Sequence, residues 1–314
     1  MTTFPIKPFR FGIQASKASS RKEWVDLAQR AEANGFDVLT MPDHFDDQLA
    51  PVPALMTAAD ATTTLRIGAL VWDNDYKHPV VLAKELATMD VLSNGRLEIG
   101  IGAGWMRSDY DMAGMAYNSP GVRIERFIEG VDIIRGHMQD APYSLQGKHY
   151  TVTNLNGLPK PVQKPCPPIL VGGGGKKVLT YAAKEVEIIG INGTMTAGVV
   201  GPEAISSMTS EAVDEKVGIV ATEGAHRLND IEMNVRAFFV NVTPERATAV
   251  SKIAGLIGVN DEMITNTPFA LIGSPDSIVE DLLARRERWG FSYIIVGAQD
   301  VDSFAPVVAA LRGK

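Results

Sequence analysis

Cysteine and long apolar runs are scarce in this sequence. Cys166 is the single cysteine among 314 residues, which excludes an intramolecular disulfide bond. It stands between two prolines at the start of an apolar run, and we interpret it as a small structural side chain. No segment reaches the roughly 18 to 20 consecutive apolar residues of a membrane span, and residues 1–11 lack the apolar region of a signal peptide. We therefore expect a cytoplasmic protein without a membrane partner.

Positive charge is also limited. Lys and Arg number 30 against 37 Asp and Glu, which gives a formal net charge of -7. Nucleic-acid binding draws much of its free energy from basic side chains that meet phosphates, so no nucleic-acid partner is expected. Hydrophobic residues make up 45% and charged residues 21% of the chain, as is typical of a globular protein with a large core. We expect the partner to be a small-molecule substrate.

Short apolar runs alternate with amphipathic segments along the whole chain, which is the pattern of repeated βα units. Several runs are apolar without interruption, as in parallel strands that are buried on both faces. We predict one domain over residues 1–314, an α/β fold of the (β/α)8 or TIM-barrel type. The expected strands are Arg10 to Gln14, Asp37 to Met41, Leu65 to Val71, Arg96 to Ile101, Pro168 to Gly172, Glu187 to Asn192, Ile231 to Val242, and Tyr293 to Gly297.

Helix boundaries are marked by their own signals. Ser20 and Glu23 form a capping-box pattern, and Gly35 supplies a left-handed stop. Two segments do not fit the βα repeat of a minimal barrel and are interpreted as insertions. One lies near 140–168 and the other near 259–269. The first contains a predicted hairpin followed by five prolines, and the second is a polar interruption. Insertions in a barrel often cover the mouth, so we expect both to be lids.

The chemistry of a barrel enzyme lies at the carboxyl ends of its strands. His44 follows the second expected strand, and we predict that it donates or accepts a proton. The alternative is a solvated loop histidine held by Asp43. The histidines have no spacing typical of a metal site, so no metal is expected. The five are His44, His78, His137, His149 and His226.

Aromatic and glycine residues follow the third and fourth expected strands. Trp72 offers a flat face for a planar ring, although an aromatic that closes the barrel top would look the same. Gly102, Ala103 and Gly104 let a ligand approach the backbone, and Trp105 comes next. The spacing does not match a dinucleotide-binding loop, because Arg107 stands in place of the third glycine.

The strongest local signal follows the fifth expected strand. Gly172, Gly173, Gly174 and Gly175 bring bare amides to a helix N-terminus, and Lys176 comes directly after them. The partial positive charge of a helix N-terminus favours an anion, so we interpret this turn as a phosphate cradle. A flexible turn is the alternative, although a turn needs only one or two glycines.

Together these residues resemble the luciferase-like monooxygenase superfamily, in its branch of oxidoreductases that depend on the deazaflavin coenzyme F420. The resemblance covers nearly the whole chain. It rests on six segments in the family order, Ala31 to Asp37, Asp43 to Phe45, Ala87 to Leu97, Gly100 to Trp105, Pro168 to Gly175, and Leu271 to Pro275.

The resemblance implies that the tricyclic ring of the cofactor lies in the barrel mouth and that the glycine turn holds its phosphate. It also implies a non-proline cis peptide between Leu70 and Val71 behind the ring, an acid–base role for His44, and a homodimer. Some relatives carry a glutamate where this chain has Trp105. That departure argues against a sugar-phosphate dehydrogenase and leaves hydride transfer unaffected, since the ring performs that chemistry.

We therefore expect an F420-dependent oxidoreductase that transfers a hydride between the deazaflavin and a small organic substrate. Reduction of an activated C=C or C=N bond is favoured over alcohol oxidation. Trp72 and Trp105 are expected to wall the substrate pocket, and His44 to handle the proton. Two alternatives stay open, because one fold hosts many functions. They are an FMN-dependent two-component monooxygenase and a barrel that binds a flavin without turning it over.

Overall fold

The computed structural model describes residues 4–314, and its centre is a closed parallel barrel. Strands follow one another in the order β3-β2-β1-β13-β10-β9-β8-β5-β4, and a further pairing of β3 with β5 closes the ring. Both β3 and β4 pair with β5, so they share one of eight barrel positions. The barrel strands are β1 (Arg10–Gln14), β2 (Val38–Met41), β3 (Arg66–Ala69), β4 (Trp72–Asp73), β5 (Leu97–Gly102), β8 (Ile169–Gly173), β9 (Ile188–Ile191), β10 (Glu232–Arg236) and β13 (Phe291–Gly297). The predicted (β/α)8 fold is confirmed.

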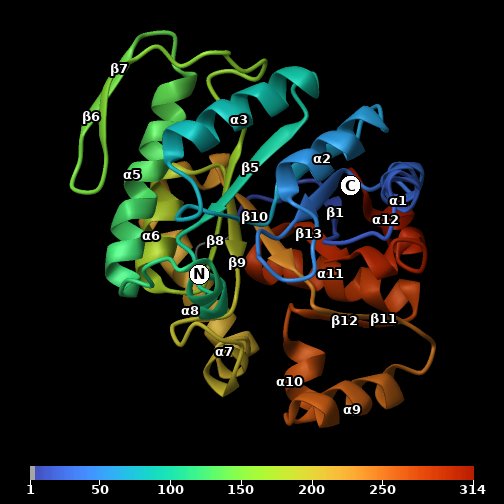
Figure 1. The fold of residues 1–314 in the computed structure, drawn as a ribbon. Coiled ribbons are helices and arrows are strands. Elements are labelled where there is room, and N and C mark those ends of the chain that lie inside the picture. Colours follow the sequence, from blue (N-terminus) through green and yellow to red (C-terminus); the bar gives the residue numbers. More distant parts are fainter. Residues whose placement is uncertain (1–3) are drawn as a thin grey trace.

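Helices surround this barrel, and the main apolar core lies between the two layers (Figure 1). None of the helices among residues 4–314 is long and apolar enough to cross a membrane. The helices are α1 (Arg21–Ala33), α2 (Pro51–Asp60), α3 (Pro79–Leu92), α4 (Arg107–Ala113), α5 (Pro120–Met138), α6 (Lys176–Glu185), α7 (Pro202–Ser206), α8 (Ser210–Glu223), α9 (Arg246–Ile257), α10 (Asp261–Asn266), α11 (Pro275–Trp289) and α12 (Ala305–Leu311), with short 3-10 turns η1 (Ala225–Asp230) and η2 (Ala298–Asp300).

The predicted helix signals work as expected in α1. The Ser20 hydroxyl accepts a hydrogen bond from the Glu23 amide at 3.2 Å, and the Glu23 carboxylate accepts one from the Ser19 amide at 2.7 Å. Gly35 has a φ of 82°, the left-handed conformation that glycine adopts without steric cost. Local capping therefore fixes the length of this helix.

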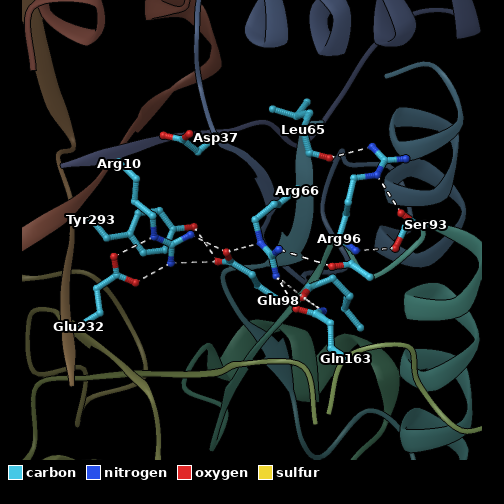
Figure 2. Close-up of polar contacts among 12 residues, drawn as sticks. Arg10, Asp37, Leu65, Arg66, Ser93, Arg96, Glu98, Gln163, Glu232 and Tyr293 are labelled. Atoms are coloured by element: carbon cyan, nitrogen blue, oxygen red, sulfur yellow. Dashed lines mark hydrogen bonds and ion pairs between the residues drawn. The ribbon is translucent and has the colours of Figure 1, made fainter. Parts of the chain in front are cut away.

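An ion network closes the amino-terminal end of the barrel (Figure 2). Glu98 is 4% exposed and accepts hydrogen bonds from Arg66 at 2.7 Å, from Arg10 at 2.5 Å and from Tyr293 at 3.2 Å. Glu232 pairs with the other side of Arg10 at 2.7 Å. Burial by itself raises the pKa of Glu98, and the guanidinium groups of Arg10 and Arg66 outweigh it and lower that pKa.

A layer of apolar side chains separates this network from the opposite end of the barrel. It consists of Val38, Leu170, Ile188, Tyr293 and Ile295, with Leu70 and Val71 packed against it. These side chains fill the barrel interior at this level, and a cavity lies on the other side of the layer, at the carboxyl ends of the strands. In barrel enzymes the interior is usually packed with side chains, and the active site lies at the carboxyl ends of the strands.

One predicted strand was wrong in extent. The run Ile231 to Val242 is two strands, because β10 ends at Arg236 and β11 (Phe239–Val242) leaves the barrel. β11 pairs in parallel with β12 (Ala270–Gly273), a strand that the sequence analysis missed. The amides of Phe238 and Phe239 both donate to Phe269 O at the start of this pairing. The apolar pattern continues through both strands, so it does not reveal where the chain changes partner.

The two insertions have different structures. The predicted hairpin is confirmed as β6 (Tyr143–Gln146) and β7 (Thr151–Leu155), and Figure 1 shows it outside the barrel beside α5. Residues 259–269 include α10, which packs with α9, β11 and β12 around a small apolar core of their own. Figure 1 places this group on the opposite side of the view from the hairpin.

The peptide bond between Leu70 and Val71 is cis, as the resemblance implied. It lies between the end of β3 and the start of β4. The single strand predicted over Leu65 to Val71 is therefore shorter than expected at both ends. Both Leu70 and Val71 lie at the upper end of the barrel, where the cavity begins.

Candidate functional site

A cavity of about 240 Å³ opens at the carboxyl ends of the barrel strands. Its walls come from the segments that follow β2, β3, β5, β8 and β9, from β10, and from the start of α5. The lining residues are Asp43, His44, Leu70, Val71, Asp73, Gly102, Ala103, Gly104, Trp105, Pro120, Arg123, Ile124, Gly172, Gly173, Gly174, Gly175, Val178, Gly190, Ile191, Asn192, Gly193, Thr194, Met195, Thr196, Asn234 and Arg236. Segments far apart in the sequence thus build one site.

His44 faces this cavity and is held from behind by Asp109. Nδ1 of His44 lies 2.7 Å from Oδ2 of Asp109, a residue of α4 that has no exposed surface. The same carboxylate accepts hydrogen bonds from the Tyr76 hydroxyl at 2.8 Å and from the Phe45 amide at 3.4 Å. Since Nδ1 is engaged by the carboxylate, Nε2 is the ring nitrogen left for a ligand. The alternative of a solvated histidine held by Asp43 is not what the structure shows.

Trp105 and Trp72 have different environments. Trp105 lines the cavity, and its ring meets the His44 ring edge-on at a centroid distance of 5.8 Å. Trp72 does not line the cavity, and the prediction for it was wrong. It is 2% exposed within the main core, and its Nε1 has no hydrogen-bond partner among residues 4–314. Successive side chains of a strand point to opposite faces, so Asp73 takes the place at the mouth.

Asp73 and Asp43 make this side of the cavity acidic. The Asp73 carboxylate accepts hydrogen bonds from the Tyr110 hydroxyl at 3.2 Å and from the Asp75 amide at 2.8 Å. Burial, together with the neighbouring Asp75 charge, raises the pKa of Asp73 to about 7. Burial also raises the pKa of Asp43, whose carboxylate accepts from the Asp73 amide at 3.3 Å. Both carboxyl groups therefore hold a proton more readily than an exposed aspartate.

Gly172 to Gly175 all line the cavity, as predicted. The amides of Gly174 and Gly175 donate no hydrogen bond to any acceptor within residues 4–314, so they are available to an anion at the start of α6. A Cβ on Gly174 would lie 2.5 Å from Asn192 O and 2.6 Å from Gly193 O. Glycine is required there because the next loop packs directly on the backbone.

Lys176 does not belong to the cavity lining, and its predicted contact with the cofactor stays a prediction. Its side chain is exposed at the first position of α6. The expected lids are not cavity walls either, since no lining residue comes from 140–168 or 259–269. The loop after β9 takes that role with Thr194, Met195 and Thr196.

Several functional residues were missed by the sequence analysis. Asp109 is one of them, because the sequence does not show that α4 brings it to the imidazole of His44. Arg123 and Arg236 also line the cavity, and they come from α5 and β10. Arg236 donates from Nε to Gln14 Oε1 at 2.7 Å, and Gln14 donates to the carbonyl of Leu70 at 3.0 Å. Burial lowers the pKa of Arg236 to about 10.

The cavity fits a flat ring with an anionic tail. Gly172 leaves the surface above Val71 open, since even a Cβ there would come no closer than 3.7 Å to Val71. Leu70 and Val71 provide an apolar face for a ring, and the free amides of Gly174 and Gly175 provide donors for a phosphate. Within residues 4–314, no group of three His, Cys, Asp or Glu side chains is arranged to hold a metal ion.

Comparison with known proteins identifies a family for this chain. The model of the luciferase-like monooxygenase family matches residues 4–293. The FMNH(2)-dependent dimethylsulfone monooxygenase of Pseudomonas fluorescens (strain Pf0-1) is 26% identical over 96% of this chain and 93% of its own length. The F420-dependent glucose-6-phosphate dehydrogenase of Microbacterium testaceum (strain StLB037) is 27% identical over 78% of this chain and 72% of its own.

A solved structure shares the fold. The coenzyme F420-dependent tetrahydromethanopterin reductase from Methanopyrus kandleri superimposes with a TM-score of 0.77 at 18% identity, covering 98% of this chain and 99% of that one. The named relatives are oxidoreductases that use either F420 or reduced FMN. On the strength of the family match over residues 4–293, this chain is a member of the luciferase-like monooxygenase family.

Proposed function

We propose that this protein is an F420-dependent oxidoreductase that transfers a hydride between the deazaflavin and a small organic substrate. The observation that supports it is the pairing of His44 with buried Asp109 in the same cavity as the free amides of Gly174 and Gly175. One part of the cavity handles a proton and another receives an anion. A hydride carrier with a phosphate tail requires both.

When bound, the deazaflavin ring would supply the hydride chemistry. Leu70 and Val71 would support the ring, and the amides of Gly174 and Gly175 would hold its phosphate. Asp109 keeps the Nδ1 proton of His44 on its own side, so Nε2 can give a proton to the substrate or take one from it. Trp105, whose ring meets the imidazole edge-on, would shield that face of the cavity from water.

We propose reduction of an activated C=C or C=N bond as the reaction class. Trp105, an uncharged side chain, stands against His44 at the end of the fourth barrel strand. A carboxylate at that place would serve the oxidation of a sugar alcohol, and an aromatic wall serves a less polar substrate. We further propose that the protein acts as a homodimer, and light scattering at micromolar concentration tests that assembly.

A second candidate is an FMN-dependent two-component monooxygenase. The similarity to an FMNH(2)-dependent dimethylsulfone monooxygenase over 96% of this chain favours it. FMN and F420 both combine a tricyclic ring with a phosphate, so the cavity accommodates either. A third candidate is a barrel that binds a flavin without turning it over, and the engaged His44 argues against it.

Cofactor titration of the purified protein separates these candidates. The expected result is fluorescence-detected binding of F420, followed by oxidation of reduced F420 when enones or imines are added. Tight FMN binding without F420 affinity, together with oxygen consumption in the presence of reduced FMN, would establish the monooxygenase. Unchanged turnover in His44→Ala across a broad substrate panel would remove His44 from the chemistry.

A further inference from the structure

Lys216 is a buried lysine directly behind the glycine turn. It belongs to α8 and is 6% exposed. Its Nζ donates hydrogen bonds to Asn192 O at 2.8 Å and to Ser207 O at 2.5 Å. Both acceptors are backbone carbonyls, and they lie 15 positions apart at the two ends of one loop. The side chain therefore closes that loop at its base.

This loop forms a wall of the cavity. It carries Thr194, Met195 and Thr196 into the lining, and the Thr194 amide donates to the Ser207 hydroxyl at 2.7 Å. The loop is also hydrogen-bonded to the glycine turn. Asn192 N donates to Gly173 O at 3.0 Å, and Thr194 Oγ1 donates to Gly174 O at 3.2 Å. Lys216 thus fixes the loop that shapes the anion cradle.

The ammonium group is also close to the cradle itself. Asn192 O, which accepts from Lys216, would lie 2.5 Å from a Cβ on Gly174. One carbonyl group therefore separates the positive charge from the backbone whose amides face the anion. Lys176 and Lys177, the basic residues next in sequence, are exposed, so water screens their charge.

No carboxylate neutralises Lys216. Among residues 4–314 it forms no ion pair, and the nearby Glu215 acts only through its longer-range charge. Burial lowers the pKa of Lys216 to about 8, so the group is still mostly charged at neutral pH. Its two hydrogen bonds use two of three donors and leave the buried charge without a counter-ion. A ligand anion in the cradle would supply that counter-charge.

We propose that Lys216 is a positioning residue that makes this cavity selective for a phosphate ester of a flat ring over the same ring without phosphate. It acts by holding the Asn192-to-Ser207 loop against Gly174 and by placing a buried positive charge behind the free amides. This inference rests on the proposed function, because it assigns the anionic part of the cofactor to the cradle.

The test compares one neutral variant with one charged control. Lys216→Gln removes the charge and keeps a donor for the two carbonyls, whereas Lys216→Arg keeps the charge. Each is titrated with FMN, F420 and riboflavin, which has a ring but no phosphate. Lys216→Gln is expected to lose about tenfold or more in affinity for FMN and F420, equivalent to about 1.4 kcal/mol. Its riboflavin affinity should stay unchanged, and Lys216→Arg should bind all three like the wild type.

Equal losses for FMN and riboflavin would show a role in loop shape only and would overturn the proposal, as would unchanged affinity for FMN and F420. If Lys216→Gln does not fold, Lys216→Met replaces it as the neutral variant. Inorganic phosphate provides a readout that does not depend on the proposed function. If neither ring binds the wild type, the proposed function fails. The role of Lys216 at an anion site is then supported only if phosphate raises the Tm of the wild type but not the Tm of Lys216→Gln.

Discussion

Asp109 lies behind His44 with its Oδ2 2.7 Å from the imidazole Nδ1, and it has no exposed surface. Tyr76 and the amide of Phe45 hold the same carboxylate, so the carboxylate has little freedom to rotate. A buried and fully hydrogen-bonded acceptor fixes both the orientation and the tautomer of a histidine. Under the proposed function, proton transfer at the cavity would therefore depend on a residue that does not line it.

Replacing Asp109 by Asn tests this dependence. The amide cannot accept all of the same hydrogen bonds, so His44 is expected to lose its fixed tautomer, and kcat should fall about 100-fold, as general acid–base catalysis predicts. KM should stay near the wild-type value, because Asp109 does not line the cavity. Asp111→Asn is the matched control, since Asp111 lies on the same helix and pairs with Arg107 at the surface. Equal effects of both variants on kcat would contradict the assignment.

Trp105 and Trp72 provide a contrasting pair of substitutions. Trp105→Ala should raise KM about tenfold, because the loss of an aromatic wall removes roughly 1–2 kcal/mol of apolar contact with substrate. Trp72→Phe should leave KM unchanged and lower the Tm, since Trp72 packs in the core. Steady-state kinetics and thermal unfolding of both variants check this. A higher KM for Trp72→Phe would mean that the core position also reaches the substrate.

Glu98 is expected to matter for stability and not for ligand binding. Glu98→Gln leaves Arg10 and Arg66 without their buried partner (Figure 2), and breaking a buried ion pair costs about 3–5 kcal/mol of unfolding free energy. The network lies at the amino-terminal end of the barrel, so cofactor affinity should not change. Urea denaturation measures the first effect and titration the second. The control is Glu125→Gln, whose exposed pair with Lys148 should contribute less than about 1 kcal/mol.

Asp73 predicts a specific pH dependence of stability. Its folded pKa is about 7 and lies above the ordinary value of 3.8, so the folded state binds the proton more tightly than the unfolded state. Its contribution to the unfolding free energy is complete below the unfolded pKa and is lost as the pH rises towards about 7. Urea denaturation of the wild type and of Asp73→Asn at several pH values should show their difference changing across this interval. A difference in unfolding free energy that does not change with pH would contradict the raised pKa of Asp73.

Most of the architecture could be predicted from the sequence, because parallel strands and capped helices leave local signals. The capping pattern at Ser20 is confirmed, and Gly172 to Gly175 lie at the cavity, where their predicted binding of a phosphate stays a prediction. The division of the run Ile231 to Val242 could not be predicted, since both strands share one apolar pattern and differ only in their partner. The periodicity of apolar residues indicates which residues are buried, but it does not indicate which strand or helix they pack against.

The site was predicted best where it is built from backbone. Gly102, Ala103, Gly104 and the cis peptide at Leu70 are where the sequence placed them. The roles predicted for side chains depended on whether each side chain points into the cavity, and the sequence does not show this. Trp72 points into the core and Lys176 points to solvent, whereas the lysine buried behind Gly174 is Lys216, about 40 residues later.

The most direct test of the account is a crystal structure of the protein with F420 or FMN bound. We predict that the ring lies against Leu70 and Val71, and that its phosphate accepts hydrogen bonds from the amides of Gly174 and Gly175. Nε2 of His44 should then face the reactive side of the ring. A ring bound outside this cavity, or a phosphate directed away from the glycine turn, would contradict the account.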